Sequence, residues 1–344
     1  MIAATLFLSA PWWVSLLVPG FSTAAQALTI KLTRIQLIGM VFTSAVSVLW
    51  SIYHARQKFV WTELSALIAN ASALLFLALA LGRFGIAAAA WAMVLRMGLQ
   101  LAWLLPGLGW RPRGRARGQG VFKSPTMISA WQRLRPLLLG TAYYKTDPLV
   151  DRFLTSMSPA GDLSLLYMGQ QLYGVVNVIV DKALSAPMVP LLAMQAQIND
   201  WQLFRRTYRW RLLIVGGLTI AGYVALVAGG ELVLDLLIGH GGISAQNVRS
   251  LWWIMVALGG VFVGGAMGQI AATTFYAMGD TRTPTRMSVL TYSVYVPTKI
   301  VAFLRFGLPG LAVVTSVYFM LNLALQILLL ERFVLPAHAR RKTT

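Results

Sequence analysis

The chain contains no cysteine and only three histidines among its 344 residues. The absence of cysteine excludes disulfide scaffolds, thiol catalysis, iron–sulfur clusters and cysteine-ligated zinc, and three histidines leave little for a histidine metal site. We therefore predict neither a metal nor a cofactor. The sequence also lacks the His-Glu-x-x-His, Walker lysine-loop and Gly-x-Ser-x-Gly patterns, so it predicts no enzyme and no direct use of ATP.

Charged residues are scarce as well. They make up 11% of the chain, whereas a soluble domain carries about 25%. Hydrophobic residues make up 58%, and the mean hydropathy is +0.69. This composition excludes a disordered protein, a coiled coil and a typical cytosolic enzyme, and it predicts that hydrocarbon surrounds the chain.

Long apolar windows along the sequence also indicate a membrane protein. A bilayer-spanning helix needs about 20 mostly apolar residues. About ten such windows are present, over residues 2–21, 35–53, 60–81, 85–108, 137–157, 165–193, 212–238, 251–277, 287–304 and 311–330. The prediction is an all-α polytopic membrane protein with about ten transmembrane helices in two lobes.

A Gly- and Arg-rich connection follows the fourth window and predicts the boundary between the lobes. The predicted parts are an N-terminal lobe over 1–108, a basic cytoplasmic linker over 109–131, a C-terminal lobe of about six helices over 132–332, and a basic cytoplasmic tail over 333–344. The Arg-x-Arg-x-Arg-x-Arg run of the linker is interpreted as a loop on anionic membrane lipids rather than as an RNA site.

The formal charge is +19, from 29 Lys and Arg against 10 Asp and Glu. Cytoplasmic loops of membrane proteins hold the excess of cations. If the first window starts inside, nineteen cations fall on inside segments and five on outside segments. The split predicts a multi-pass protein of the bacterial inner membrane with both termini cytoplasmic. It also accounts for the basic character without nucleic acid as a partner.

Ionisable residues inside the fifth window are candidates for function, because charges in hydrocarbon are costly. At about 100° per residue, Asp147 and Asp151 share one sector of a helix, and Lys145 and Arg152 lie on the adjoining sector. Two interpretations remain open. This face lines a cavity for an anionic or sugar-bearing headgroup, or its charges pair with one another and with neighbouring helices.

The sixth window carries a second polar stripe. Gln170, Tyr173 and Asn177 are spaced by three and four residues, and Gln171 lies beside them. The stripe lines the same cavity or supplies hydrogen bonds between packed helices. Lys299, in the ninth window, either contacts a phosphate or pairs with a carbonyl group.

Two further features predict structural roles. Gly260, Gly264 and Gly268 recur at every fourth residue, which permits close helix packing. Pro148 falls inside the fifth window and predicts a kink there.

The stretch Phe275–Pro284 reads Phe-Tyr-Ala-Met-Gly-Asp-Thr-Arg-Thr-Pro. It resembles the Phe-Tyr-Ala-x-Gly-Asp-Thr-Arg-Thr-Pro signature of the MurJ (MviN) lipid II flippase family. Ala10–Trp12 with Val18–Phe21, Val150–Phe153 and Pro187–Leu192 agree with that family in order and spacing. The resemblance implies the fold of the multidrug/oligosaccharidyl-lipid/polysaccharide exporters, with two helical lobes around a central cavity that opens alternately to each side.

The chain also departs from the family. It resembles the family from the third helix to the twelfth, and the first two and last two helices have no counterpart. Gln170 and Gln171 stand where the family commonly has an Asp-Arg pair, so the diphosphate of lipid II loses one cationic partner. A neutral pair still suits sugar hydroxyls.

From this resemblance we expect a flippase that moves a polyprenyl-diphosphate-linked saccharide, either lipid II or a related cell-envelope polysaccharide precursor, across the inner membrane by alternating access. The expected headgroup contacts are Lys145, Asp147, Asp151, Arg152, Gln170, Gln171, Tyr173, Asn177 and Lys299. Asp280 and Arg282 are expected in a structural or gating turn. The expected partners are the lipid-linked saccharide, anionic membrane lipids and a coupling ion.

Two alternatives remain open. A cation-coupled multidrug antiporter of the same superfamily would use Asp147 and Asp151 to exchange H⁺ or Na⁺ for an organic cation, and its cavity walls would be net negative. Here Lys145, Arg152 and Lys299 at least balance the acids. The second alternative is a non-transporting, degenerate membrane scaffold.

Overall fold

The computed structural model describes residues 2–106, 131, 134, 138, 140–185, 187–239 and 243–335. These residues form helices and connecting turns, and no strand occurs among them. The chain divides into two compact units, Met1–Gln119 and Gly120–Thr344. The division falls inside the predicted linker. Most of that linker and most of the predicted tail lie outside the described residues, so the domain boundaries stay predictions.

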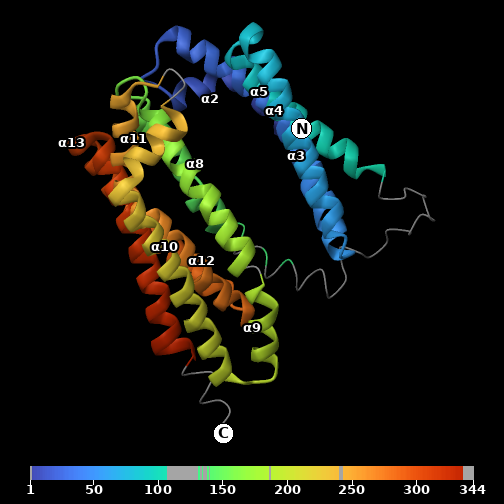
Figure 1. Ribbon diagram of the computed structural model, residues 1–344, viewed down its shortest axis with the longest axis vertical. Helices are drawn as coiled ribbons and strands as arrows, with labels where there is room; N and C mark the ends of the chain where they lie inside the picture. Colours follow the sequence, from blue (N-terminus) through green and yellow to red (C-terminus); the bar gives the residue numbers. More distant parts are fainter. Residues whose placement is uncertain are drawn as a thin grey trace. The chain divides into compact units, whose positions relative to one another are not determined.

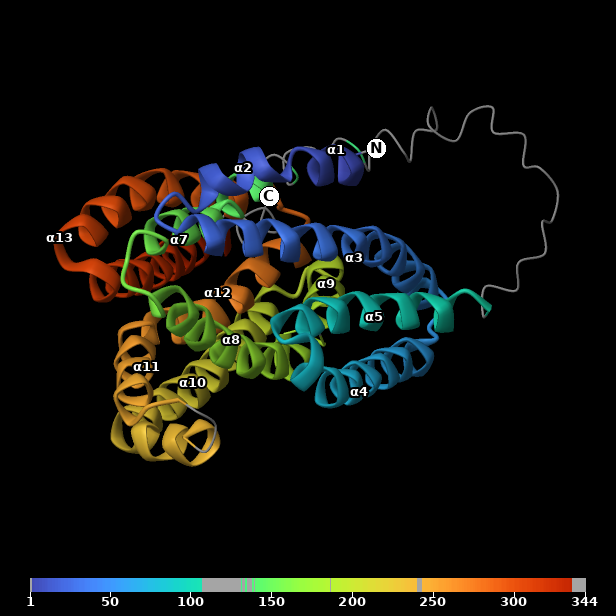
Figure 2. The same ribbon diagram turned by 90° about the horizontal axis from the view of Figure 1, so that it is seen from above.

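The described part of unit 1, residues 2–106, contains five helices, α1 (Ile2–Leu8), α2 (Ala10–Leu17), α3 (Thr23–Ala55), α4 (Phe59–Phe84) and α5 (Ile86–Leu104). The first apolar window is divided between α1 and α2, with a proline in the first turn of α2. The Ser22 side chain caps α3 by accepting a hydrogen bond from the backbone of Ala25. α3, α4 and α5 lie side by side (Figure 2).

Unit 2 carries the remaining elements. They are α7 (Asp147–Thr155), α8 (Asp162–Val180), the π-helical turn η3 (Asp181–Ser185), α9 (Met188–Gln197), α10 (Trp201–Ile238), α11 (Ala245–Ala257), α12 (Gly259–Ala277), α13 (Arg282–Leu329) and the π-helical turn η4 (Leu330–Val334). α10, α12 and α13 run alongside one another (Figure 1). Two buried apolar clusters fill this unit, one around Leu251 and Leu311 and the other around Leu192 and Phe275.

Glycines bring α12 against the second half of α13. A Cβ atom at Gly260 would lie 2.6 Å from the carbonyl oxygen of Ser316, and one at Gly264 would lie 2.9 Å from the carbonyl carbon of Phe319. The predicted close packing is therefore confirmed at these two positions. It is wrong at Gly268, where an added Cβ would meet nothing within 4 Å, because this glycine faces a pocket instead.

Six described segments are long and apolar enough to cross a membrane, and a seventh results if α11 and α12, bent by 43°, form one span. α13 contains both the ninth and the tenth window, which meet at a bend where Gly307 has φ 62° and ψ −147°. A left-handed φ of this kind favours glycine. The all-α polytopic membrane fold is confirmed. The count of about ten stays a prediction, because the fifth window lies partly outside the described residues.

Candidate functional site

A buried group of three charges lies in unit 2. The Lys299 side chain on α13 is 0% exposed, and its Nζ donates to Oδ1 of Asp147 at 2.8 Å. The same ammonium group forms an ion pair with Asp151, whose side chain is 7% exposed. Two carboxylates from α7 therefore share one ammonium group. Buried charges persist in this way only when they are paired and hydrogen-bonded.

Local sequence explains why the two carboxylates point the same way. Residues 140–144 are helical, a turn follows at Lys145 and Thr146, and α7 starts at Asp147 with Pro148 in its first turn. Proline suits this position because the first helical N–H groups have no intrahelical partner. Pro148 thus begins a helix after a break. Asp147 and Asp151, four residues apart, then lie on one face of α7.

Neutral side chains complete the hydrogen bonding of the acids. Gln170 on α8 donates to Oδ2 of Asp151 at 3.2 Å. The hydroxyl of Tyr295 lies 3.4 Å from Oδ2 of Asp147 and 2.9 Å from the hydroxyl of Thr315. The Tyr295 ring also lies under the ammonium group of Lys299, with 4.8 Å from Nζ to the ring centroid. These ion pairs and hydrogen bonds therefore connect α7, α8 and both halves of α13.

A polar pocket of 400 Å³ adjoins this charge group. Its lining comes from the turn before α7, from the glycine face of α12 and from both halves of α13. The polar lining residues are Tyr144, Lys145, Asp147, Gln269, Tyr276, Thr285, Ser288, Tyr292, Tyr318, Asn322 and Gln326. Lys145 and Asp147 are the charged residues in the described lining and balance each other. The remaining polar groups are hydroxyls and amides, which can both donate and accept hydrogen bonds.

The predicted site residues on α8 lie in different environments in the structure. Gln170 reaches Asp151, but Tyr173 is buried in the core, where its ring stacks on Phe262 and its hydroxyl donates to the carbonyl of Met255 at 2.8 Å. Gln171 is exposed and donates to the hydroxyl of Tyr167.

Asn177, half-buried on the same helix, lies beside α12, because a Cβ atom added at Gly265 would be 3.7 Å from its Nδ2. On α7, Arg152 is exposed and forms no ion pair with the described residues. The structure thus brings Asp147, Asp151, Gln170 and Lys299 together, with Lys145 at the adjoining pocket. The role of all nine residues in substrate contact stays a prediction.

The predicted turn around Asp280 has a defined structure. Oδ1 of Asp280 accepts hydrogen bonds from the backbone N–H groups of Arg282 and Thr283, each at 3.0 Å. These are two of the N–H groups that the start of α13 leaves without an intrahelical partner. Gly279, with φ 77°, makes the reversal after α12 possible. Arg282 is exposed, so the carboxylate of Asp280, rather than an Asp–Arg ion pair, holds the turn.

Apart from Lys299, the polar residues that α13 contributes to the pocket and to its charged end were not predicted from the sequence. Thr285, Ser288, Tyr292, Tyr295 and Lys299 are spaced by three, four, three and four residues, which marks one face of a helix. In the second half of α13, Thr315, Tyr318, Asn322 and Gln326 repeat this pattern. All of them except Tyr295, Lys299 and Thr315 line the pocket. Those three lie at its charged end. The spacing was present in the sequence and would have identified these residues.

Comparison with known proteins gives consistent matches. A family model described as lipid II flippase MurJ matches residues 1–341. A probable lipid II flippase MurJ of Vibrio cholerae is 24% identical over 227 residues, covering 66% of this chain and 42% of that protein. One from Bdellovibrio bacteriovorus is 21% identical over 315 residues, covering 91% of this chain and 60% of that protein. The chain thus spans 42% to 60% of the length of these two relatives.

Solved structures match nearly the whole chain. An inward-closed conformation of lipid II flippase MurJ superimposes with a TM-score of 0.78 at 15% identity, covering 98% of this chain and 70% of that one. An inward-facing MATE family multidrug resistance transporter superimposes with a TM-score of 0.79 at 14% identity, covering 98% of this chain and 78% of that one. At these identities the similarity shows the fold, which lipid flippases and drug transporters share.

Proposed function

The chain belongs to the lipid II flippase MurJ family, and on this premise we propose that it moves a polyprenyl-diphosphate-linked saccharide across the bacterial inner membrane. The substrate is lipid II or a related cell-envelope polysaccharide precursor. The saccharide headgroup crosses through a polar path by alternating access, and the lipid tail stays in the bilayer. No covalent bond is made or broken. Both termini are cytoplasmic, as the distribution of cations predicts.

The observation that carries the proposal is the composition of the 400 Å³ pocket in unit 2. Tyrosines and amides dominate its polar lining, and its two charged lining residues have opposite signs. Sugar hydroxyls both donate and accept hydrogen bonds, as tyrosine hydroxyls and side-chain amides do. The half-buried ring of Tyr318, which also lines this pocket, adds aromatic surface of the kind that a sugar ring can cover.

The same charges argue against a multidrug antiporter for organic cations. Such a transporter needs carboxylates that are free to meet a cation. Here Lys299 already occupies the space between Asp147 and Asp151, and it is fully buried. An incoming cation would have to displace an ammonium group that has no exposure to water. The substrate expected from this arrangement is neutral or anionic at the headgroup.

Reconstitution tests the proposal directly. The chain is placed in liposomes that contain a fluorescent polyprenyl-diphosphate disaccharide, and a membrane-impermeant quencher reports how fast the inner-leaflet label becomes accessible. We expect faster exposure than in protein-free liposomes, and a loss of most of the increase in an Asn322→Leu variant, which removes an amide from the pocket. Leu321→Ala, at a neighbouring exposed position, is the control and should transport normally.

Two outcomes would refute the proposal. Exposure no faster than in empty liposomes would remove the transport function and favour a scaffold. Accumulation of an organic cation against a proton or sodium gradient, without lipid movement, would assign the chain to the antiporter class instead.

A further inference from the structure

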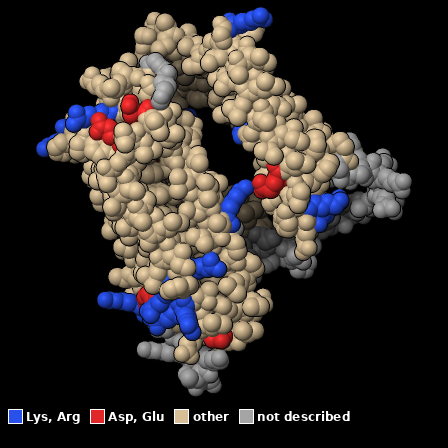
Figure 3. All heavy atoms as spheres, viewed as in Figure 1, with Lys and Arg blue, Asp and Glu red and all other residues tan. Residues whose placement is uncertain are grey.

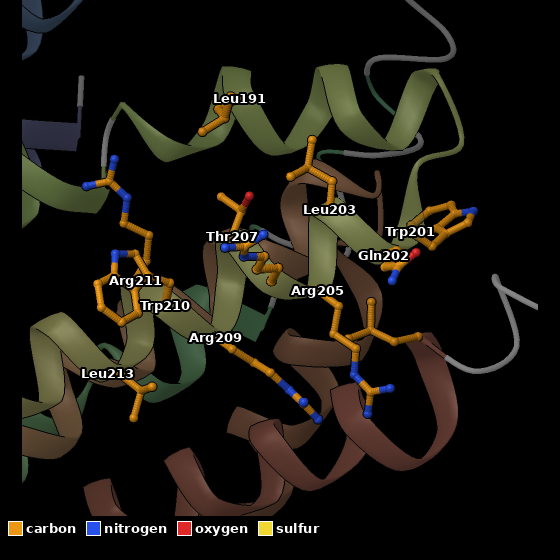
Figure 4. A pocket seen from close by; sticks show the side chains of 12 residues that line it. Leu191, Trp201, Gln202, Leu203, Arg205, Thr207, Arg209, Trp210, Arg211 and Leu213 are labelled. Carbon is orange, nitrogen blue, oxygen red and sulfur yellow. The ribbon is translucent and has the colours of Figure 1, made fainter.

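A second pocket, of 1080 Å³, lies at the start of α10 in unit 2. Leu191 of α9 and Leu335, just after η4, contribute to its walls. Four arginines, two tryptophans and four leucines line it. Figure 4 shows Arg211 directed toward the helix that carries Leu191, whereas Arg205 and Arg209 point away from that helix. The pocket therefore combines cationic and apolar surface, and it is separate from the polar pocket described above.

The positive charge of this pocket is only partly neutralised. Glu331 of η4 accepts hydrogen bonds from Nε of Arg205 at 2.9 Å and from Nε of Arg209 at 2.7 Å. One carboxylate thus serves two guanidinium groups. Within the described residues, neither Arg206 nor Arg211 forms an ion pair. Figure 3 shows the resulting cluster of basic side chains over the ends of α10 and α13.

Arg206 stands in the middle of an apolar stripe. Leu203, Arg206, Trp210 and Leu213 are spaced by three, four and three residues, so they share one face of α10. The three apolar members are 43%, 63% and 66% exposed. Arg206 is exposed as well. The guanidinium group of Arg206 thus has no acidic partner among the described residues, and exposed apolar side chains lie on both sides of it along the helix. This arrangement fits a ligand with an anionic group attached to a hydrocarbon part.

The length of α10 places this stripe at the membrane surface. Its 38 residues extend about 57 Å at 1.5 Å per residue, whereas the hydrocarbon core is about 30 Å thick. The arginine-bearing first turns therefore extend beyond the hydrocarbon into the headgroup region. Tryptophan is enriched at that depth because its ring is amphipathic. By the distribution of cations, this end of α10 faces the cytoplasmic leaflet.

We propose that this pocket binds an anionic phospholipid of the cytoplasmic leaflet. The phosphate lies against Arg206, within the positive field of Arg209 and Arg211, and an acyl chain covers Trp210 and Leu213. Guanidinium groups bind phosphate oxygens in a bidentate manner, and these exposed apolar side chains supply a wall that a soluble anion would not need. Pockets for drug-sized ligands enclose about 300–1,000 Å³, so a free phosphate would leave most of this volume unfilled.

Lipid binding to the purified full chain tests the site. Phosphatidylglycerol and phosphatidylcholine with the same acyl chains are titrated in detergent, and bound lipid is counted by native mass spectrometry. We expect phosphatidylglycerol to bind about tenfold or more tightly than phosphatidylcholine. The double variant Arg206→Gln/Arg211→Gln should lose that preference, because charge-assisted hydrogen bonds each change affinity by about tenfold or more.

A second double variant serves as the control. Arg286→Gln/Arg332→Gln removes the same charge from exposed positions outside the pocket lining, so its preference for phosphatidylglycerol should match the unmodified chain. Equal affinity for the two lipids, or equal loss in both double variants, would overturn the proposal. Tighter binding of a polyprenyl phosphate with the same arginine dependence would overturn the choice of phospholipid. These measurements involve no transport and remain decisive whatever the chain carries.

Discussion

The buried ammonium group of Lys299 on α13 is paired with the carboxylate of Asp151 on α7, a helix that precedes it by several spans. Asp147 joins the pair from the same helix. Two acids share this one ammonium group, and Lys145 in the adjoining pocket lining balances the second negative charge. Because these groups connect α7 to the first half of α13, we expect them to affect the stability of unit 2 as well as its transport.

Lys299→Met should lower the thermal unfolding midpoint of the purified chain strongly. Removing one partner of a buried ion pair leaves uncompensated charge and typically costs about 3–5 kcal/mol, and here two carboxylates lose their cation. Arg305→Met, at an exposed position on the same helix, should have little effect. Adding Asp151→Asn to Lys299→Met should restore part of the loss. Equal midpoints for the Lys299 and Arg305 variants would mean that the pairing contributes nothing to stability.

Sequence patterns were sufficient for the membrane fold and for part of the site. Apolar windows predicted the membrane fold, and the four-residue spacing of Asp147 and Asp151 predicted that they share a face. The motif around Asp280 and Arg282 predicted a turn. Each of these features depends on residues close together in the chain, so local periodicity and turn chemistry determine them.

The partners of those residues could not be predicted in the same way. Nothing near Asp151 in the sequence identifies Lys299, because their pairing depends on how α13 packs on α7. Tyr173 lies on a polar stripe of α8, yet it turns into the core because Phe262 of α12 offers a stacking surface and Met255 a carbonyl group. A tyrosine is suited both to the wall of a polar pocket and to the core, and only tertiary packing decides between the two.

The glycines of α12 should respond differently to the same substitution. Gly264→Ala places a methyl group 2.9 Å from the backbone of α13, and overpacking of this kind costs about 1–3 kcal/mol. Gly268→Ala adds its methyl group to the polar pocket, where nothing lies within 4 Å. We therefore expect a lower unfolding midpoint for the first variant and an unchanged or slightly higher one for the second. The reverse order would contradict the packing of α12 on α13.

Topology can be tested because the chain has no cysteine of its own. The distribution of cations predicts that the basic linker is cytoplasmic, so a cysteine at Gly118 should stay unlabelled when intact cells are treated with an impermeant maleimide. It should react once the inner membrane is permeabilised. Labelling in intact cells would invert the proposed orientation, and with it the assignment of the arginine pocket to the cytoplasmic leaflet.

The polar pocket should be reachable by water along α13. Asn322 lines it, whereas the neighbouring Leu321 is 51% exposed on a face that would meet lipid. Thiol reagents attack the thiolate, which forms only where water can solvate the charge. A cysteine at Asn322 should therefore react with a small, water-soluble methanethiosulfonate at least about tenfold faster than a cysteine at Leu321, and a bound lipid-linked saccharide should slow that reaction. Equal rates at the two positions would mean that the pocket is not an aqueous path, and the hydroxyls and amides around it would then serve only to join α12 to α13.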